Sequence, residues 1–492
     1  MTWREYHEAT KHSTESLMRS RHTLDWAHMP DPFRHYDGVP VLDLPADPPA
    51  PEIPALEVLQ GESGATLAGD GGAFLSQLLY HSAAISASKR VPSTGYKYAL
   101  RVNPSSGNLH PTEFHFATRG LKEWADGLYH YRPSSHMAEQ RALGDFTTNL
   151  AGAAAPIVIM LTSIAWREAW KYRARAYRYC LHDVGHAWQA LSLAARALGC
   201  RSYAIGGFSD DEVALSCRLS EDEWPMLLVA IEAPPVVLRA PDEHETVWFG
   251  GKANRLSKET VSYPAIEGIH TATKLYSLPG QPGSAEVPRD GSGEIRLPPP
   301  DSSRRGFGAV VRTRRSALDF RGGTESMTLA QLSAVLDAAT RPLDADLAAV
   351  RFVQLYVYAH RVEGLPAAVY RHWPERGELE QVRPGDQRVT AAGLSLGQDL
   401  AANACVAFSM IADLDRAARA HGDRGYRYAH FEAGALGQRM YVAAEALGLR
   451  ATGIGAFFDD QVHRYLGIER EQGQVVYHFA IGHPVPDPRV EA

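Results

Sequence analysis

An internal duplication is the feature that most constrains how this chain folds. The 37 residues that start at Arg175, RAYRYCLHDVGHAWQALSLAARALGCRSYAIGGFSDD, align without gaps on the stretch that starts at Arg424, RGYRYAHFEAGALGQRMYVAAEALGLRATGIGAFFDD, and 17 of the 37 positions are identical. The offset of 424 − 175 = 249 residues is far longer than the roughly 20 to 50 residues of stacked repeat units. The sequence therefore predicts two copies of one domain.

The 492 residues are enough for two or three domains with cores of their own. We expect an N-terminal extension at 1–60, a first domain at 61–240, a linker at 241–304 and a second domain at 305–490. The linker is assigned from a run rich in Pro, Gly and Ser, SLPGQPGSAEVPRDGSGEIRLPPPDSS. The extension contains a proline-heavy stretch and is expected to wrap over a domain.

Both copies are predicted to mix helices and strands in the same order. Apolar residues from Tyr177 to Leu198 alternate steps of four and three, which predicts a long helix that ends at Gly199. The other elements of the first copy are expected at 72–87 (helix), at 113–118, 127–131, 156–162 and 226–232 (strands), and after Asp210 (a short helix). Those of the second copy are expected at 329–339 (helix), at 351–358, 367–371, 404–411 and 474–481 (strands), and in a long helix through Leu447. Because regular βαβ alternation is missing, we expect an α+β fold.

Composition and charge exclude several functions. A net charge of −7 and a pI near 6.3, without a block of Lys and Arg, argue against nucleic-acid binding. No apolar run is long enough for a membrane span, and MTWREYHEATKHS lacks the apolar centre of a signal peptide. We therefore expect a cytoplasmic protein. Its four scattered cysteines are expected to be buried thiols: Cys180, Cys200, Cys217 and Cys405.

Familiar catalytic motifs are missing from the sequence. It contains no HExxH or comparable ligand spacing, so no metal site is predicted. A GxGxxG pattern after a strand is absent, which argues against a Rossmann fold, and no GxSxG elbow indicates a serine hydrolase.

Two polar loops differ between the copies. PSSGNLHP, at Pro104 to Pro111, has only TRPLDADLAA in the matching place of the second copy. Conversely, RTRRS, at Arg312 to Ser316, is expected before the first helix of the second copy, where the first copy has GATLAGDGGA. Each loop also has an ordinary interpretation, the first as a turn and the second as a basic helix entrance with Ser316 as the N-cap. Because the loops are complementary, we expect each copy to hold half of one binding site.

Together these motifs resemble the nitroreductase superfamily. Arg-x-Ser before a helix, Pro-Ser-Ser-Gly ahead of a strand and Gly-Ile-Gly after the long helix carry the resemblance, which covers residues 60–240 and 305–490. Tyr-Arg-Tyr, Gly-His and Ala-Leu-Gly between Tyr177 and Gly199 are similar to the SagB/ThcOx-type FMN-dependent dehydrogenases of that superfamily. The resemblance implies two nitroreductase-like α/β/α domains in tandem, which form an intramolecular pseudo-dimer with FMN at their interface.

The resemblance also assigns FMN contacts to three loops. One loop would hold the phosphate and ring edge, a second would reach the flavin from the other copy, and the N–H of Gly455 in the third would donate to flavin N5. The expected FMN-binding residues are Arg314, Arg315 and Ser316, then Pro104, Ser105, Ser106, Gly107 and Asn108, and finally Ile454, Gly455 and Ala456. The matching Ile205, Gly206 and Gly207 of the first copy would serve only a second, incomplete site.

Lys171-Tyr172 resembles the Lys-Tyr pair that is implicated as the base in this branch, and the second copy has His421-Gly422 in this place. A base must have its pKa lowered from about 10, either by burial or by a neighbouring charge. The ordinary alternative for this pair is an exposed helix start. Tyr177, Tyr179, Tyr426, Tyr428 and His186 are expected to be core or interface residues.

The resemblance implies an FMN-dependent oxidoreductase that oxidises a small or peptide-derived substrate by hydride transfer to flavin N5, for example an azoline to an azole. O2 or another acceptor would reoxidise the flavin, and a homodimer is compatible with this function. One alternative is an NAD(P)H-dependent nitro or quinone reductase. The other is a flavin-free scaffold within a biosynthetic complex.

Overall fold

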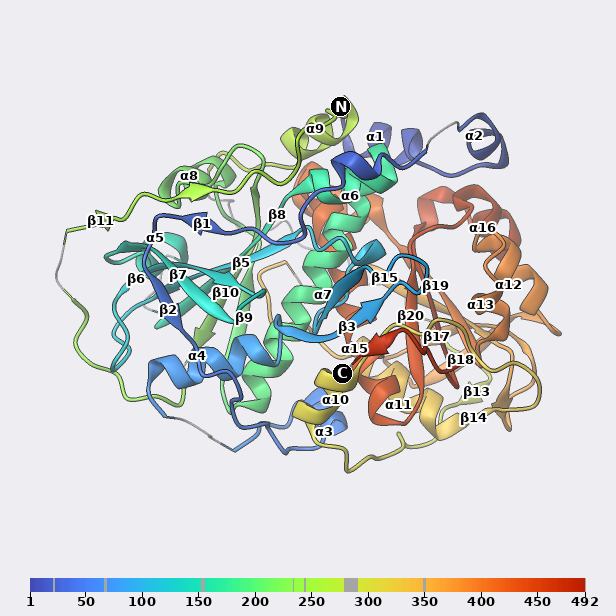
Figure 1. Ribbon diagram of the computed structural model, residues 1–492. Coiled ribbons are helices and arrows are strands. Elements are labelled where there is room, and N and C mark those ends of the chain that lie inside the picture. The colour runs from blue at the N-terminus through green and yellow to red at the C-terminus, as the bar shows by residue number, and fades with distance from the viewer. Residues whose placement is uncertain are drawn as a thin grey trace.

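The computed structural model describes residues 1–20, 23–65, 69–151, 155–232, 234–242, 245–277, 291–347 and 351–491. Each half of the chain forms one sheet with helices packed around it. The two longest helices, one from each half, lie between the two sheets (Figure 1). This arrangement is the predicted tandem of two α+β domains.

The sheet of the first half has the strand order β11-β7-β6-β5-β8-β10-β9, with β2 also paired to β7. All of its pairings are antiparallel. The strands are β2 (Val41–Asp43), β5 (Thr112–Thr118), β6 (Gly127–Arg132), β7 (Met137–Leu143), β8 (Ile157–Ser163), β9 (Arg201–Ile205), β10 (Trp224–Glu232) and β11 (Val247–Trp248). The helices around it are α4 (Gly71–Tyr80), α5 (Thr147–Ala151), α6 (Ala165–Tyr172), α7 (Ala176–Ala197) and α8 (Asp210–Ser216).

The sheet of the second half has the order β13-β18-β17-β15-β19-β21-β20, in which the six strands from β18 to β20 repeat the order from β7 to β9 of the first sheet. Its strands are β13 (Ile295–Arg296), β15 (Val353–Ala359), β17 (Ala368–Trp373), β18 (Glu378–Pro384), β19 (Val406–Ala412), β20 (Arg450–Ile454) and β21 (Gln474–Gly482). Its helices are α10 (Phe307–Thr313), α11 (Leu329–Thr340), α12 (Arg388–Leu394), α13 (Asp399–Asn403), α14 (Leu414–His421), α15 (Gly425–Ala446) and α16 (Asp459–Leu466). A short parallel pair, β14 (Met327–Thr328) and β16 (Val362–Glu363), lies beside it.

The duplicated helices α7 and α15 cross at a pair of glycines that occupy equivalent positions in the two copies, Gly185 and Gly434. A Cβ added to Gly185 would lie 2.2 Å from the carbonyl oxygen of Phe431, and one added to Gly434 would lie 2.2 Å from that of His182. Only glycine permits such a close approach of two backbones. The helices therefore pack directly against each other, and their outer faces are also buried.

Buried ion pairs join the two halves symmetrically. Arg178 Nη1 lies 2.8 Å from Asp459 Oδ1, and in the equivalent place Arg427 Nη1 lies 2.7 Å from Asp210 Oδ1. Each aspartate also pairs with the arginine three residues before its partner. All of these side chains are almost completely buried. The interface is thus fixed by charge as well as by apolar packing.

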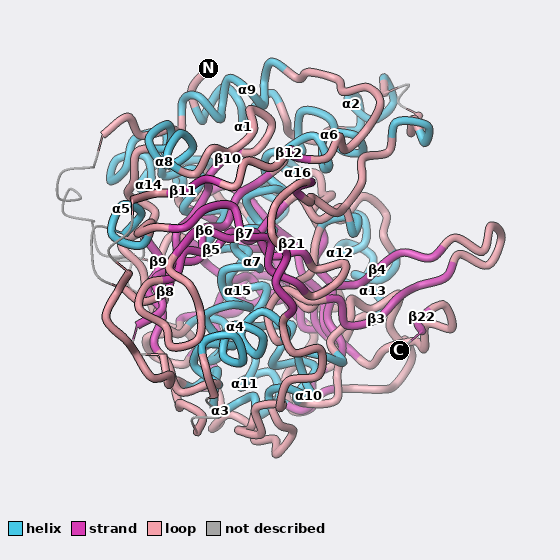
Figure 2. Tube along the Cα trace, turned by 60° about the vertical axis from the view of Figure 1, so that its left-hand side comes forward, coloured by secondary structure: helices cyan, strands magenta, loops and turns pink. Residues whose placement is uncertain are grey.

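Three segments outside the two sheets bridge the domains. Tyr6 in α1 (Trp3–Ala9) packs edge-on against Tyr177 and Tyr426, one from each long helix, at 5.9 Å in both cases. At the other end of the chain, β22 (Val490–Glu491) pairs with β3 (Ile85–Arg90), whose hairpin partner is β4 (Lys97–Arg101) (Figure 2).

The third bridging segment is α9 (Pro264–Ala272), which lies within the predicted linker. His270 stacks on Trp224 of the first domain at 3.8 Å, and Thr273 accepts a hydrogen bond from Arg427 of the second at 2.8 Å. The region therefore does more than connect the domains. Part of its Pro-, Gly- and Ser-rich run, at 278–290, lies outside the described residues. The remaining α-helices and strands are α2 (Thr14–Arg19), β1 (Tyr36–Asp37), which pairs with β12 (Lys252–Ala253), and α3 (Ala55–Gln60).

One predicted element is wrong in extent. The helix expected at 72–87 ends at Tyr80, and the residues from Ile85 onward form β3 instead. The run of Ala and Ser residues around Ile85 permits either state, and pairing with β4 and β22 selects the strand.

Candidate active site

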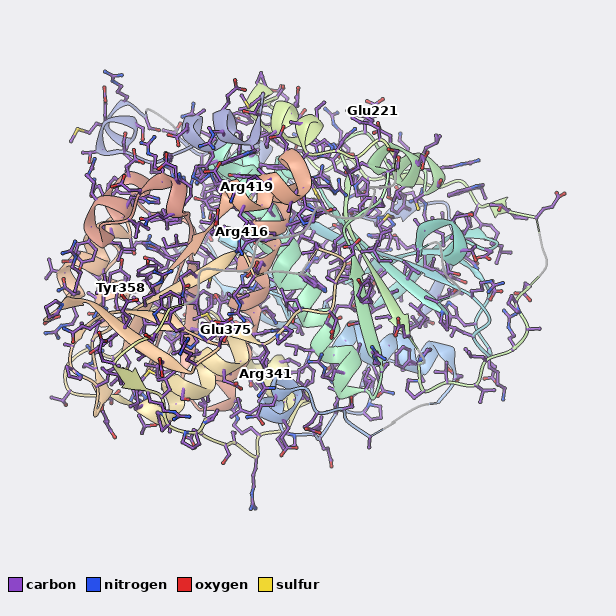
Figure 3. The ribbon with its side chains drawn as sticks, turned by 180° about the vertical axis from the view of Figure 1, so that it is seen from behind. Glu221, Arg341, Tyr358, Glu375, Arg416 and Arg419 are labelled. Atoms are coloured by element: carbon purple, nitrogen blue, oxygen red, sulfur yellow. The ribbon has the colours of Figure 1, made fainter. Side chains whose placement is uncertain are left out.

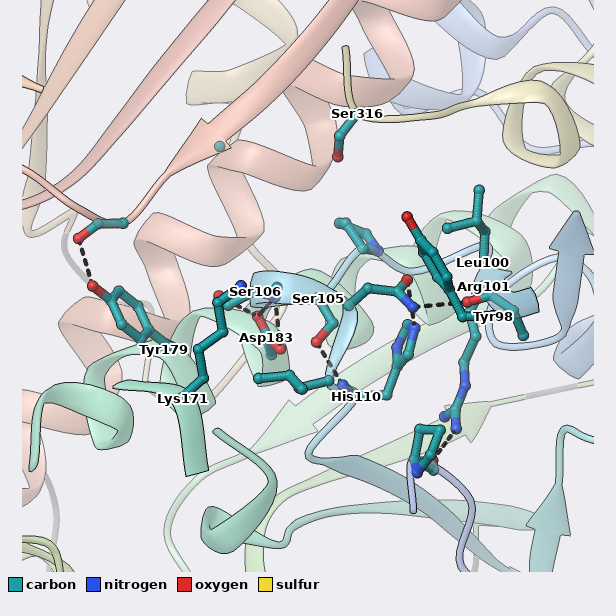
Figure 4. Close-up of a pocket in the computed structure, with 18 of the residues that line it drawn as sticks. Tyr98, Leu100, Arg101, Ser105, Ser106, His110, Lys171, Tyr179, Asp183 and Ser316 are labelled. Atoms are coloured by element: carbon teal, nitrogen blue, oxygen red, sulfur yellow. Dashed lines mark hydrogen bonds between the residues drawn. The ribbon is translucent and has the colours of Figure 1, made fainter. Parts of the chain in front are cut away.

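A cavity of about 730 Å³ lies between the two domains and is the candidate active site. Every predicted FMN-binding residue of the three loops lines it, as do Lys171 and Tyr172. Figure 4 shows Ser105 and Ser106 on one side of this space and Ser316 on the other. The folded chain thus brings together residues that are separated by more than 200 positions, and the cavity has the size of a cofactor site.

The loop from Pro104 to Asn108 is held in an unusual backbone conformation. Gly107 and Asn108 both have φ of 60°, and His110 has φ of 49°. Such left-handed values are uncommon outside glycine. Hydrogen bonds hold them in place: Ser105 Oγ accepts the N–H of His110 at 2.8 Å, and Asn108 Nδ2 donates to the carbonyl of Ala99 at 2.9 Å. The loop is therefore a rigid wall of the cavity.

Two arginines of the second domain reach across to backbone carbonyls of the first. Arg314 Nε donates to the Val102 carbonyl at 3.0 Å, and Arg315 Nη2 donates to that of Ser86 at 2.9 Å. Each guanidinium keeps a buried nitrogen without a partner among the described residues, Arg314 Nη1 and Arg315 Nε. Arg101, also buried in the cavity wall, keeps two such nitrogens.

These three guanidiniums form no ion pair within the described chain. Burial, followed by the positive charges of Arg314, Arg450 and Arg312, lowers the pKa of Arg315 to about 10, although the charge of Glu445 partly opposes this shift. Buried cations are costly unless an anion accompanies them. A planar guanidinium suits a phosphate group, so this end of the cavity fits a phosphate-bearing ligand.

Ser316 does not cap a helix. It follows the end of α10 at Thr313, and the next helix, α11, begins at Leu329 with Thr328 as its N-cap. Ser316 Oγ instead lies 2.8 Å from Tyr441 Oη, and the same Oη accepts the N–H of Gly453 at 2.9 Å. The N-cap interpretation is wrong, and no helix N-terminus at Ser316 supplies the anion site.

The loop after β20 packs closely on a tyrosine of the first domain. Tyr179 Oη donates to the carbonyl of Gly455 at 3.0 Å, and a Cβ on Gly455 would lie only 2.3 Å from the Tyr179 ring. Tyr179 is buried, as predicted for the tyrosine stripe, but it also lines the cavity. His186 is likewise a buried interface histidine in the cavity wall, with Nε2 3.1 Å from Tyr477 Oη.

Lys171 and Tyr172 both point at the Pro104–Asn108 loop. A Cβ on Gly107 would lie 2.7 Å from Tyr172 Oη and 3.0 Å from Lys171 Nζ. The two residues form the last turn of α6 and are half-buried, so the alternative of an exposed helix start is wrong. Burial, followed by the nearby charge of Glu168, raises the pKa of Tyr172 well above its usual range. Tyr172 therefore remains a neutral phenol at ordinary pH.

The second copy lacks the Lys-Tyr pair of this site. At the offset of 249, Lys171 and Tyr172 correspond to Ala420 and His421, one residue before the predicted His421-Gly422 match. The helix ends agree with this register, since α6 and α14 end at Tyr172 and His421.

The equivalent of the Gly455 loop is closed by the chain itself. Asp346 accepts the N–H of Gly206 at 2.7 Å and that of Gly207 at 2.9 Å. Leu347 is buried against Gly206, where a Cβ would meet its side chain at 2.9 Å. The second, incomplete site is therefore filled by protein.

The mouth of the cavity is aromatic. One wall comes from the N-terminal extension, including Trp26, which is 68% exposed and packs edge-on against Trp170 at 5.2 Å. The other wall is the β3–β4 hairpin, where Tyr96 and Tyr98 stack at 6.4 Å. The extension thus belongs to the site.

A smaller cavity of about 240 Å³ lies elsewhere in the second domain, near Arg416, Arg419 and Glu375, which Figure 3 labels in the view from behind. Its lining includes carboxylates as well as arginines, and Arg351 pairs with Glu375 at 3.0 Å. In contrast, the three arginines of the larger cavity form no ion pair within the described chain.

Several lining residues escaped the sequence analysis because they belong to no motif. They are Arg101, Asn103, Asp183, Gln398, Tyr441, Tyr477 and the wall from Leu24 to Phe33. Asp183 lies within the duplicated stretch, but the same helix also carries Arg178 and Arg196, so its charge alone did not single it out.

A model of the nitroreductase family matches residues 82–231 and 311–483, one segment in each half of the chain. The chain belongs to the nitroreductase family and is a tandem oxidoreductase of that family. It is similar over nearly its whole length to the crystal structure of a protein from Anabaena variabilis that carries the name nitroreductase. The TM-score is 0.77 with 25% identity, and the match covers 98% of this chain and 99% of that one.

Two curated relatives match one half of the chain or less. The protein MJ1384 of Methanocaldococcus jannaschii, also named a nitroreductase, is 31% identical over 183 residues, which are 36% of this chain and 90% of the relative. The microcin B17-processing protein McbC of Escherichia coli is 28% identical over 142 residues, 26% of this chain. The match spans about half of McbC, 52% of its length.

Three general features concern the described residues. None of the described helices is both long enough and apolar enough to cross a membrane. The same residues contain no group of three or more His, Cys, Asp or Glu side chains arranged for a metal ion. The four cysteines are buried and free, as predicted.

Proposed function

We propose that this protein is an FMN-dependent oxidoreductase with one FMN per chain, bound in the cavity between the domains. One observation carries the proposal: the buried and unpaired guanidiniums of Arg101, Arg314 and Arg315 lie in the same cavity as the loops expected to contact the flavin. Guanidinium groups suit a phosphate, and the polar loops suit the ring edge. FMN, when bound, supplies two-electron redox chemistry.

We further propose that the substrate is a small or peptide-derived molecule that loses a hydride and a proton, as an azoline does when it becomes an azole. The similarity to a microcin-processing protein supports a peptide-derived substrate. The aromatic mouth supports a flat or apolar group. Lys171 and Tyr172 then position the substrate against the Gly107 loop, where a neutral Tyr172 donates a hydrogen bond.

The experiment for this proposal is quantitation of FMN released from the denatured protein after reconstitution. About one FMN per chain supports the single composite site, and the absence of binding would favour the flavin-free scaffold. Arg314→Ala and Ser105→Ala, one in each domain, are each expected to weaken FMN binding, the arginine change by about ten- to a hundredfold. The controls are Arg304→Ala and Ser134→Ala, which change exposed residues outside the cavity. An effect of only one of the two site variants would contradict a shared site.

The alternative function is an NAD(P)H-dependent nitro or quinone reductase. Anaerobic mixing of the FMN-loaded protein with NADH or NADPH separates the two. Rapid bleaching of the flavin would favour the reductase, whereas slow bleaching supports the dehydrogenase.

A further inference from the structure

Two buried carboxyl groups lie directly behind the Pro104–Asn108 loop. Asp183 on α7 lines the cavity and accepts two hydrogen bonds from Ser106, one from the backbone N–H and one from Oγ, both at 3.1 Å (Figure 4). Glu168 on α6 is completely buried, and its carboxyl group lies beside the side chains of Asp183 and Ser105. The pair adjoins Lys171 and Tyr172, which occupy the following turn of α6.

Two carboxylates at close range in a buried site cannot both be ionised at moderate cost, so one proton is shared between them. Burial, then the charge of Asp183, raises the pKa of Glu168 well above its usual range. Burial also raises the pKa of Asp183 to about 7, although Ser105 and Ser106 stabilise its anion.

The other titratable groups around the pair do not remove this proton at neutral pH. They are Lys171 and Tyr172 on α6, Cys180 on α7 and Tyr477 on β21. Burial raises the pKa values of Tyr172, Cys180 and Tyr477 well above their usual ranges, so these three stay neutral. The ammonium of Lys171 is the one cation of this set, and its charge lowers the pKa of Glu168.

The second copy shows that the fold does not require this pair. Glu168 corresponds to Ala417 in α14, and Asp183 corresponds to Glu432 in α15. Glu432 has a backbone role instead, because it accepts the N–H groups of Phe352 and Val353 at the start of β15. Helix α14 nevertheless has the same length and the same end as α6. The carboxyl pair is therefore present only in the copy whose α6 faces the cavity.

We propose that Glu168 and Asp183 form a proton-sharing carboxyl pair and that Asp183 accepts the proton that the substrate loses during oxidation. This inference rests on the proposed function. The oxidation breaks two bonds to hydrogen. The hydride leaves with both electrons of its C–H bond for the proposed flavin. The other hydrogen leaves as a proton to the Asp183 carboxylate, and its bonding electrons form the new double bond of the product. Atoms and electrons balance without a further reagent until the flavin is reoxidised.

The first test measures the shared proton in flavin-free protein. Infrared spectra of protein labelled with ¹³C at aspartate carboxyls isolate a protonated aspartic acid, which we expect to disappear as the pH rises through about 7. Asp183→Asn should abolish this band, and Glu168→Gln should shift its midpoint by at least about one pH unit, because it removes a coupled partner. Glu432→Gln, in the second copy, should leave the aspartate band unchanged. If the aspartate band remained in Asp183→Asn, or if its midpoint did not shift in Glu168→Gln, the proposal of a shared proton would be wrong.

The second test measures the role of the pair in proton transfer. The group that accepts a proton in substrate oxidation donates one in the reverse direction, so 1,4-benzoquinone added to dithionite-reduced, FMN-loaded protein serves as a probe. We expect reoxidation of the wild type to slow above about pH 7. Asp183→Asn should be at least about tenfold slower at pH 6, without this pH dependence. Glu432→Gln should match the wild type. Wild-type rates and pH profile in Asp183→Asn would contradict the role.

The two tests separate failure of this inference from failure of the proposed function. If FMN does not bind, the proposed function fails, while the infrared titration still decides whether the proton is shared. If FMN binds and the aspartate band does not titrate near pH 7, the function stands and the carboxyl pair is rejected.

Discussion

The backbone N–H of Gly206 donates a hydrogen bond of 2.7 Å to the carboxylate of Asp346, and this contact closes the second of two equivalent sites. At the same position of the other copy, Gly455 lines the open cavity. A symmetric ancestor would have had two equal sites. In this chain one is open and carries unpaired arginines, and the other is filled by the loop at 343–347.

Asp346→Ala is expected to lower the free energy of unfolding by about 1–2 kcal/mol, because the N–H groups of Gly206 and Gly207 lose their acceptor. It should not create a second FMN site, since Arg101, Arg314 and Arg315, the arginines proposed to hold the phosphate, line the open cavity. Urea unfolding and FMN quantitation measure the two effects.

The control is Asp344→Ala in the same loop. Its side chain is 62% exposed and pairs only with Arg196, so its effect on stability should stay below about 0.5 kcal/mol. Two FMN per chain in Asp346→Ala would show that Asp346 alone blocks the second site.

The buried ion pairs between the domains predict a loss of stability in acid. Burial by itself would raise the pKa of Asp459, but Arg175 and Arg178 more than compensate and hold it below its usual value. Because the pKa of Asp459 is lower in the folded than in the unfolded protein, its ion pairs stabilise the fold fully above about pH 4, the pKa of an aspartate in the unfolded chain. This stabilisation is lost as the pH falls through the lower pKa of the folded state. Asp459→Asn should therefore cost about 3–5 kcal/mol at pH 7, where it leaves two buried arginines unpaired, and less at pH 3.

Urea unfolding at pH 7 and pH 3 tests this difference. Asp460→Asn is the matched control, because the neighbouring Asp460 is 43% exposed in its pairs with Lys11 and Arg470. Its cost should be about 1 kcal/mol or less. Equal costs for the two variants at pH 7 would show that the buried pair contributes no more than a surface one.

Gly185→Ala is expected to destabilise the protein by at least about 2 kcal/mol. Its Cβ would lie 2.2 Å from the Phe431 carbonyl oxygen, so α7 and α15 would have to separate. Gly393→Ala in α12 is the control, because nothing lies within 4 Å of its Cβ, and it should be neutral or stabilising by up to about 1 kcal/mol. Thermal unfolding measures both, and a Gly185→Ala protein as stable as the wild type would contradict the close crossing.

Gly107→Ala tests the contact between the loop and the Lys-Tyr pair. Gly95→Ala is matched for backbone strain, since both glycines have positive φ, at 60° and 70°, and each alanine should cost about 1 kcal/mol. Only the Cβ at residue 107 would displace Lys171 and Tyr172, because nothing lies within 4 Å of the one at 95. We expect Gly107→Ala to lower the turnover rate of the FMN-loaded protein at least about tenfold, and Gly95→Ala to leave it within twofold. Similar rates in both variants would mean that the position of the pair is not critical.

Periodicity and duplication predicted the long helices and four strands of each main sheet, but they missed other elements. Strands β7, β9, β18 and β20 of these sheets were not predicted. The β3–β4 hairpin and α6 were not predicted, because their apolar residues are too few and too irregular to reveal a period. The strand that follows the helix end at Tyr80 depends on pairing with β22, and the position of Ser316 depends on its contact with Tyr441. Both partners come from distant parts of the chain.

The sequence by itself determined that this protein is two copies of one α+β domain. The two 37-residue stretches align without gaps, so the spacing of the residues that become buried is the same in both copies. It also indicated that complementary loops were kept, since these are visible as differences between the copies. Only the tertiary structure decided that Asp346 fills the second site, that Arg101, Arg314 and Arg315 have unpaired nitrogens in one cavity, and that Glu168 adjoins Asp183. The physical reason is that hydrogen bonding, charge pairing and desolvation depend on distances between residues far apart in the chain, and sequence spacing does not encode those distances.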